Sequence, residues 1–180
     1  MKTVRLKKLK AAAGAGLAWV RRGRSPVHGR GLYARRLIPA GTRVIEYVGE
    51  RITKAEALRR EDRRLARLAA GKEGCVYIFE LNKRHDIDGN VPYNEARLIN
   101  HSCGPNCEPR NLRGRIWIVA LRDIAPDEEL NYDYGFEYSE WRDHPCRCGA
   151  PKCVGFIVNV GQRWRVRRIL AGERRRKRGG

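Results

Sequence analysis

The sequence predicts a mainly β fold of the α+β class, built from short strands and one clear helix. Several short segments are rich in β-branched and aromatic residues, which favour a pleated, half-buried surface, and Gly, Asn and Pro turns separate them. These segments are residues 19–22, 42–47, 75–81 and 115–121. No Gly-rich strand-to-helix turn of the dinucleotide-binding kind occurs in the sequence. The 180 residues suit one compact domain.

The helix is predicted at about residues 54–70. Thr53 and Glu56 have the Thr-x-x-Glu form of a capping box, and Gly71 provides a stop signal. Apolar residues recur at helical spacing between them, at Leu58, Leu65, Leu68 and Ala69. The remaining face carries five arginines and is expected to be a solvated surface, with a nucleic-acid-binding face as the alternative. They are Arg59, Arg60, Arg63, Arg64 and Arg67.

The formal net charge of +19 is concentrated at the two ends of the chain. Residues 1–36 hold eleven Lys or Arg and no acid, and residues 162–180 hold nine with Glu173 as the single acid. Such ends either bind polyanions, by releasing counterions from phosphates, or serve only as solubilising tails. Residues 174–180 are expected to be disordered when free.

Six cysteines allow two interpretations. They are Cys75, Cys103, Cys107, Cys146, Cys148 and Cys153. Three disulfides are one possibility, but disulfide scaffolds belong to shorter chains with small apolar cores. We favour zinc thiolate ligation, which implies a reducing compartment. Cys75 and Cys107 lack partners at ligand spacing and are interpreted as buried or free thiols.

Five motifs occur in a fixed order along most of the chain, from Leu17 to Phe156. They are Ser-Pro-Val-His-Gly-Arg-Gly-Leu-Tyr-Ala at 25–34, Val-Ile-Glu-Tyr-Val-Gly-Glu at 44–50, Ala-Arg-Leu-Ile-Asn-His-Ser-Cys at 96–103, Glu-Leu-Asn-Tyr-Asp-Tyr at 129–134 and Cys-x-Cys-x4-Cys at 146–153. In this combination the chain resembles SET-domain protein lysine methyltransferases with a post-SET zinc motif. The resemblance implies a β-clip-like fold with pseudoknot-like threading, in which the segment holding Tyr134 passes under the loop that holds Asn100 and His101.

The implied reaction explains the aromatic residues. Methyl transfer from a sulfonium to an amine is an in-line displacement that depends on alignment. The lysine must also be uncharged; at a pKa of about 10.4 this costs roughly 4–5 kcal/mol near pH 7, so an apolar channel is needed. By resemblance, Tyr134 and Tyr47 are the catalytic tyrosines, and Tyr132 and Phe156 line the substrate channel. A hydroxyl at Tyr132 would leave less room for added methyls, which predicts mainly monomethylation.

The resemblance also assigns the cofactor and the metal. S-adenosylmethionine would bind to five residues: Arg30, Gly31, Asn100, His101 and, as a weaker candidate, Arg97. One structural zinc would be held by four sulfurs with no open coordination position. These are Cys103, Cys146, Cys148 and Cys153. Tyr93 stands where the family usually has Gly, and Leu98 where Phe is common, so the detail of the cofactor pocket is expected to differ.

The predicted organisation is a basic N-terminal arm at 1–16, a SET domain at 17–138, a post-SET zinc segment at 139–160 and a basic C-terminal tail at 161–180. The expected substrate is a lysine of a histone or another basic DNA-associated protein, with nucleic acid contacted through the basic termini. A catalytically silent, zinc-stapled nucleic-acid or chromatin-binding module is the alternative. No membrane span is expected, and the predicted location is intracellular, in a bacterial cytoplasm and nucleoid or a eukaryotic nucleus.

Overall fold

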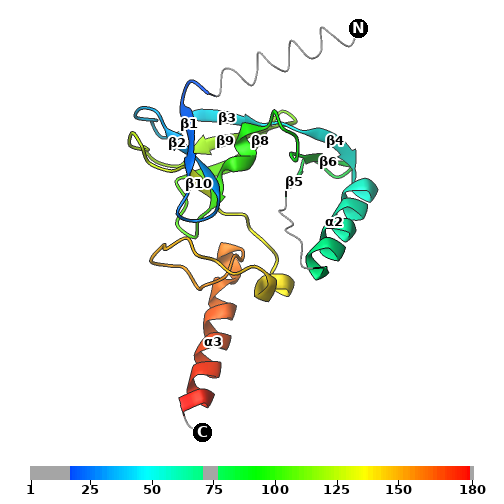
Figure 1. The fold of residues 1–180 in the computed structure, drawn as a ribbon, viewed down its shortest axis with the longest axis vertical. Coiled ribbons are helices and arrows are strands. Elements are labelled where there is room, and N and C mark those ends of the chain that lie inside the picture. The colour runs from blue at the N-terminus through cyan, green and yellow to red at the C-terminus, as the bar shows by residue number, and fades with distance from the viewer. Residues whose placement is uncertain (1–16, 71–76, 179–180) are drawn as a thin grey trace.

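The computed structural model describes residues 17–70 and 77–178, which form four small sheets, two α-helices and three short 3-10 helices (Figure 1). In chain order these are β1 (Val20–Arg24), β2 (Arg30–Ala34), β3 (Arg43–Tyr47), β4 (Glu50–Thr53), α2 (Lys54–Ala69), β5 (Ile78–Glu80), β6 (His85–Asp88), η1 (Glu95–Leu98), β7 (Asn100–His101), β8 (Cys107–Leu112), β9 (Arg115–Ala120), β10 (Asn131–Tyr132), η2 (Tyr138–Asp143), η3 (Val160–Gln162) and α3 (Arg163–Arg178). The expected mainly β fold is confirmed. The expected N-terminal arm, Gly71 and Cys75 lie outside the described residues.

Two antiparallel sheets build the body of the molecule. β1 pairs with β2 as a hairpin, and β3, β9 and β8 form a three-stranded sheet in that order. Their inward side chains, including Leu32, Val44 and Ile118, are almost fully buried and form the main core. This burial is the main stabilising contribution, at about 25 cal/mol per Å² of apolar surface removed from water.

The third sheet has the order β4, β6, β5 and carries α2 at its edge. The Thr53 hydroxyl accepts a hydrogen bond from the Glu56 N–H at 3.2 Å, which confirms the predicted N-terminal cap. The Glu56 carboxylate does not complete the capping box, because it pairs with Arg59 and Arg60 instead.

The prediction that the arginine face of α2 is solvated is wrong for two of its arginines. Arg60 reaches Glu50 on β4 at 2.8 Å and Asp88 on β6 at 2.5 Å, and Arg64 is largely covered and paired with Glu61. Leu58 and Leu65 are 65% and 48% exposed. Ion pairs to the sheet therefore orient this helix more than its leucines do, and a hydrophobic pattern alone could not reveal that.

The fourth sheet consists of two strands far apart in sequence. β7 and β10 pair in parallel, with Asn100 opposite Asn131 and His101 opposite Tyr132. The segment before β10 runs along β2, where Leu130 N–H donates to Leu32 C=O and Ala34 N–H to Glu128 C=O. The chain that leads to Tyr134 therefore passes between the N-terminal hairpin and the Asn100–His101 segment, as the resemblance implies.

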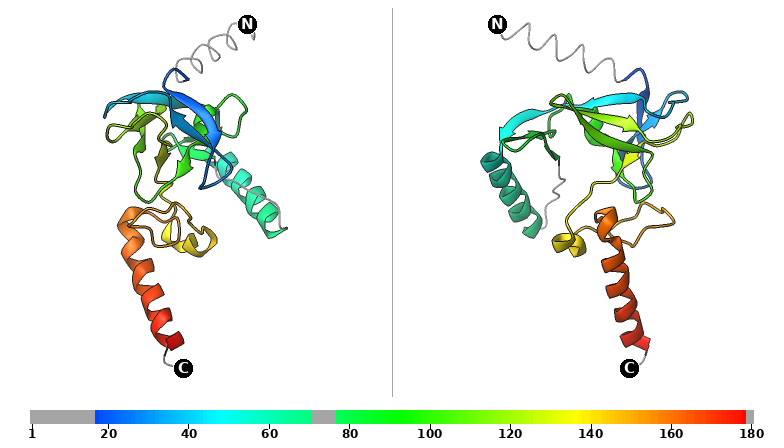
Figure 2. Two further views of the ribbon diagram at one scale, coloured as in Figure 1. Left: turned by 60° about the vertical axis from the view of Figure 1, so that its left-hand side comes forward. Right: turned by 180° about the vertical axis from the view of Figure 1, so that it is seen from behind.

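The C-terminal part forms a second, smaller core below the sheets (Figures 1 and 2). Trp141, Val158 and Val166 are its buried centre, and Phe156 and Leu170 pack against them. The first turns of α3 thus belong to this core, and the expected tail beginning at 161 is a helix instead. The expected disorder of 174–180 is wrong for Arg174–Arg178, which continue α3. No helix among the described residues is long and apolar enough to span a membrane.

Candidate active site

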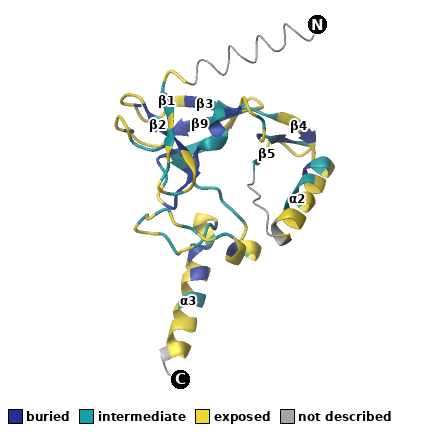
Figure 3. Ribbon diagram, in the orientation of Figure 1, coloured by how far each residue is buried: buried dark blue, intermediate teal, exposed yellow. Residues whose placement is uncertain are grey.

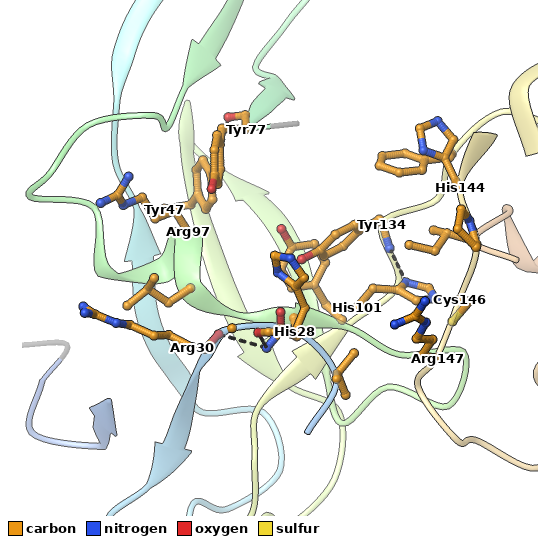
Figure 4. A pocket seen from close by; sticks show the side chains of 18 of the residues that line it. His28, Arg30, Tyr47, Tyr77, Arg97, His101, Tyr134, His144, Cys146 and Arg147 are labelled. Carbon is orange, nitrogen blue, oxygen red and sulfur yellow. Dashed lines mark hydrogen bonds between the residues drawn. The ribbon is translucent and has the colours of Figure 1, made fainter. Parts of the chain in front are cut away.

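One cavity of about 520 Å³ opens between the sheets and the C-terminal core. It lies within the usual volume range of small-molecule sites. One wall is aromatic and comes from five residues: Tyr47, Tyr77, Tyr132, Tyr134 and Phe136. Figure 4 shows Tyr47 and Tyr77 on one side of the space and Tyr134 and His101 on the other. Residues from many separate segments of the chain thus converge on a single space.

Tyr47 ends β3 and is 1% exposed. Its hydroxyl donates a hydrogen bond to the Tyr77 carbonyl oxygen at 2.9 Å, and its ring packs against Phe79 with centroids 4.5 Å apart. Burial, with a smaller effect from the neighbouring Tyr134 phenol, raises the pKa of Tyr47 well above its ordinary value. Tyr47 is therefore a neutral hydrogen-bonding group at physiological pH.

Tyr132 ends β10, and Tyr134 lies two residues after it. The Tyr134 hydroxyl donates to the Ile99 carbonyl oxygen at 2.9 Å, and the rings of Tyr132 and Tyr134 have centroids 5.0 Å apart. Burial is the main cause of the raised pKa of Tyr132, with smaller effects from Tyr134 and Tyr47. Tyr47, Tyr132 and Tyr134 all line the same cavity, so the structure brings the three predicted tyrosines together.

Asn100 and Glu129 hold the loop that precedes β2. The Asn100 amide nitrogen donates to the carbonyl oxygens of His28 and Arg30 at 3.3 and 3.0 Å, and to Glu129 at 2.8 Å. Glu129 also accepts from the Ser25 hydroxyl at 3.0 Å. The Asn100 amide nitrogen therefore positions the loop, and His28 and Arg30 of that loop line the cavity together with Asn100 and His101 of β7 (Figure 4).

His101 joins the tyrosines to the cysteines. Its Nδ1 accepts the Tyr134 N–H at 3.2 Å, and its Nε2 lies 3.3 Å from Cys103 Sγ. A ring nitrogen that accepts a hydrogen bond carries no proton, so Nε2 is the protonated nitrogen and donates to the sulfur. Because a metal would need the lone pair of Nε2, this geometry makes His101 a donor to Cys103 rather than a metal ligand.

A cluster of His and Cys side chains lies beside the cavity. One potential ligand atom from each of four residues lies within 4.8 Å of the others: His101, Cys103, Cys146 and Cys148. Cys153 also interacts with Cys103 and Cys146. None of the five cysteines among the described residues forms a disulfide. Cys107 is fully buried, and burial raises its pKa to about 12.

One pair of sulfurs has the spacing of two zinc ligands, and Cys153 lies outside the mutually close set of four residues. Cys103 Sγ and Cys146 Sγ are 4.0 Å apart, near the roughly 3.8 Å that two ligands at about 2.3 Å from a tetrahedral zinc would show. Cys103 N–H donates to Cys148 Sγ and Gly155 N–H donates to Cys153 Sγ, both at 3.3 Å. The hydrogen bond between Cys103 and Cys146 lowers the pKa of Cys146 to about 3 and raises that of Cys103. A divalent cation would replace the proton that this pair shares.

Two of the residues predicted for the substrate channel and the cofactor site lie outside the cavity lining. Phe156 packs against Trp141 with ring centroids 4.5 Å apart in the second core, and Phe136 and Ile157 line the cavity instead. Gly31 contacts the Glu129 side chain so closely that a Cβ there would overlap it. Arg30, Arg97, Asn100, His101 and Cys146 do line the cavity.

Three further functional residues have no clear signal in the sequence. Tyr77 belongs to a predicted strand but to none of the motifs, and Arg64 belongs to a helix face that was expected to be solvated. Arg163 is one of nine bases in the C-terminal 19 residues. Its guanidinium is buried, where it donates to the Cys103 carbonyl oxygen and pairs with Asp133, both at 2.6 Å. Only the fold distinguishes it from its neighbours.

Comparison with known proteins agrees with this geometry. The family model of the SET domain matches residues 29–135, so the chain belongs to the SET-domain family. Curated relatives are named histone-lysine N-methyltransferase, H3 lysine-4 specific. The Saccharomyces cerevisiae protein is 45% identical over 140 residues, or 74% of this chain, and the Emericella nidulans protein is 43% identical over 145 residues, or 77%. The matched regions are 13% and 12% of those two proteins, so this chain corresponds to a small part of each.

Proposed function

We propose that this chain is a protein-lysine N-methyltransferase that uses S-adenosylmethionine. The observation that carries the proposal is the convergence of Tyr47, Tyr132 and Tyr134 on one cavity beside the Asn100–His101 segment. A module that only binds a partner has no need for neutral phenols arranged around an internal space. Membership of the SET-domain family and the names of the relatives support the same reaction.

S-adenosylmethionine, when bound, supplies an activated methyl group. The cavity volume of about 520 Å³ is enough for it and for the end of a lysine side chain. Arg30 of the loop and Asn100 and His101 of β7 line this space, and Arg97 offers a cation to a carboxylate. The role of the chain is to hold both reactants in line and to exclude water, which is the main source of catalysis in such a displacement.

The cavity also favours an uncharged amine. Its lining includes Arg30, Arg64, Arg97 and Arg147 and, within the described residues, no Asp or Glu. Nearby positive charge and an apolar aromatic wall both disfavour an ammonium group, so they lower the pKa of the target lysine. The hydroxyl oxygens of Tyr47 and Tyr134, whose protons are donated to backbone carbonyls, can then accept a hydrogen bond from the amine without trapping the lysine as a cation.

We further propose that Cys103, Cys146, Cys148 and Cys153 hold one structural zinc, with His101 donating to Cys103. Closed four-sulfur sites of this kind stabilise folds and leave no position for a substrate. The ion would join the end of the SET domain to the second core. Because Cys146 and Arg147 line the cavity, it would fix one wall of the active site.

For the substrate, we propose a lysine of a histone or another basic, DNA-associated protein. This follows the relatives, whose names specify histone H3 lysine 4. Monomethylation is the expected main product, because the Tyr132 hydroxyl occupies space next to Tyr134. The proposed location is the compartment that holds the DNA and its basic proteins, a bacterial nucleoid or a eukaryotic nucleus.

The direct test is transfer of labelled methyl groups to histone H3 and to proteins of a cell lysate, with mass-spectrometric mapping of the modified side chain. Tyr134→Phe should lower kcat about 100-fold, because a reactant misplaced by about 1 Å loses that much. It should still bind S-adenosylmethionine. Tyr93→Phe removes an exposed phenol outside the cavity and should leave kcat unchanged. Absence of transfer to any lysine, with folded and zinc-loaded protein, would support the catalytically silent module instead.

A further inference from the structure

The outer half of α3 is an exposed cationic surface whose basic side chains form no ion pair with the described residues. α3 contains nine Lys or Arg and one acid, Glu173, which is itself paired with Arg142 at 2.8 Å. Every side chain from Ala171 to Lys177 is exposed, and Figure 3 shows this half of the helix standing away from the body. Among the described residues, none offers a carboxylate partner to Arg174, Arg175, Arg176 or Lys177.

α2 gives the contrasting case within the same chain. Its arginines are also numerous, but Arg59, Arg60 and Arg63 pair with Glu56, and Arg64 pairs with Glu61. An arginine-rich helix that only needs to be solvated can therefore pair most of its arginines with its own carboxylates, as α2 does. α3 leaves its charge unbalanced at its outer end, so its charge is available to a polyanion.

The N-terminal turn of α3 is bonded to residues of the candidate active site. Arg163 in its first turn bonds the Cys103 carbonyl oxygen and Asp133, and Val166 is completely buried in the second core. Asp133 directly precedes Tyr134. A partner bound to the outer half would consequently sit at a fixed position relative to the methyl-transfer cavity.

From this arrangement we propose that the outer half of α3 binds the phosphate backbone of duplex DNA. The inference goes beyond the proposed methyl transfer and does not depend on it. An α-helix with its side chains is about 10–12 Å across, and the major groove of B-DNA is about 12 Å wide, whereas the deep, narrow major groove of duplex RNA does not admit one. DNA presents one negative charge per 1.7 Å or so, which matches closely spaced guanidinium groups.

Binding to the backbone rather than to bases follows from the residue types. The sequence of α3 contains no Asn, Gln, Ser or Thr, so it lacks the side chains that read adenine, and its basic residues can read only guanine besides contacting phosphates. We therefore assign its contacts mainly to phosphates, which hold the protein on DNA without selecting a sequence. A basic protein substrate bound to the same duplex would be brought to the cavity despite the repulsion expected from a net charge of +19.

The test measures binding of the full chain to a mixed-sequence DNA duplex as a function of salt concentration. Two triple variants remove the same charge: Arg174→Gln, Arg175→Gln and Arg176→Gln on α3, and Arg59→Gln, Arg63→Gln and Arg67→Gln on α2. The α3 variant should flatten the slope of log affinity against log salt by about 2.7, because each lost phosphate contact removes about 0.9. The α2 variant should keep the wild-type slope.

Three outcomes would overturn the proposal: no binding to DNA, equal losses in the two variants, or tighter binding to polyglutamate or to a matched RNA duplex than to DNA. Circular dichroism and zinc content show that each variant is folded. Methyl transfer to a free substrate peptide without DNA is measured in parallel and should be the same for the α3 variant and wild type. Failure of the methyl-transfer proposal would therefore be visible separately from failure of DNA binding.

Discussion

The Arg163 guanidinium lies 2.6 Å from an Asp133 carboxylate oxygen, and this pair joins the first turn of α3 to the residue that precedes Tyr134. The same carboxylate approaches His101 Nδ1 at 3.7 Å. Arg163 also donates to the Cys103 and Val158 carbonyl oxygens. One buried arginine therefore connects the tyrosines, the cysteine cluster and the second core.

Arg163→Leu should destabilise the C-terminal part severely. Removal of one partner from a buried ion pair typically costs about 3–5 kcal/mol, and two backbone carbonyls also lose their donor. The expected results are a large fall in melting temperature, reduced zinc retention and weak methyl transfer. Arg142→Gln breaks an exposed pair with Glu173 and should cost less than about 1 kcal/mol. Equal effects of the two changes would contradict the structural role of Arg163.

Metal removal should expose four thiols and loosen the second core. In a Cys75→Ser background, which removes the one cysteine outside the described residues, the zinc-loaded protein should react slowly with a thiol reagent. After a strong chelator is added, Cys103, Cys146, Cys148 and Cys153 should react, because structural zinc contributes about 10–16 kcal/mol of apparent binding energy. Cys107 should stay protected by its burial and its raised pKa of about 12. Rapid labelling of Cys107 alone would contradict this assignment.

The sequence predicted much of the site and less of its framework. Tyr47, Tyr132, Tyr134, Asn100 and Cys103 belong to short motifs whose residues stay together in any related fold, so the motif order was informative. The roles of Arg163 and Arg64 depend on contacts between residues far apart in the chain, and both were hidden among many similar arginines. The distance of Phe156 from Cys153 in the sequence predicts that it lines the substrate channel. In the structure it packs against Trp141 in the second core, a contact that the spacing alone does not reveal.

Tyr132→Phe should change the number of methyl groups added. The Tyr132 ring is buried between Phe79 and Tyr134, with centroids at 5.8 and 5.0 Å, and under the proposed function its hydroxyl would take up space that a methylated amine needs. Without it, mass spectra over a time course should show dimethylated or trimethylated lysine accumulating after the monomethylated product. The stability change should be within about 1 kcal/mol. An unchanged product distribution at full conversion would show that Tyr132 does not limit multiplicity.

The buried phenols should make the protein less stable at alkaline pH. Burial raises the pKa of Tyr47, so the folded state keeps this proton while the unfolded state loses it above a pH of about 10. The contribution of Tyr47 to stability is thus complete below that pH and lost as pH rises further, by up to about 1.4 kcal/mol per pH unit. Urea unfolding between pH 8 and pH 11 should show a steeper loss for wild type than for Tyr47→Phe. Parallel curves would mean that Tyr47 ionises normally in the folded protein.

Gly89→Ala should damage the active site through Tyr47. A Cβ at Gly89 would overlap the Tyr47 ring and hydroxyl, and that ring is too deeply buried to move without disturbing Phe79. Overpacking of this kind costs about 1–3 kcal/mol, and displacement of the hydroxyl should reduce kcat more than cofactor affinity. Gly172→Ala is the matched control, because nothing lies within 4 Å of a Cβ there and alanine favours the helix by about 0.5–1 kcal/mol. Full activity of Gly89→Ala would mean that the position of the Tyr47 hydroxyl does not matter for catalysis.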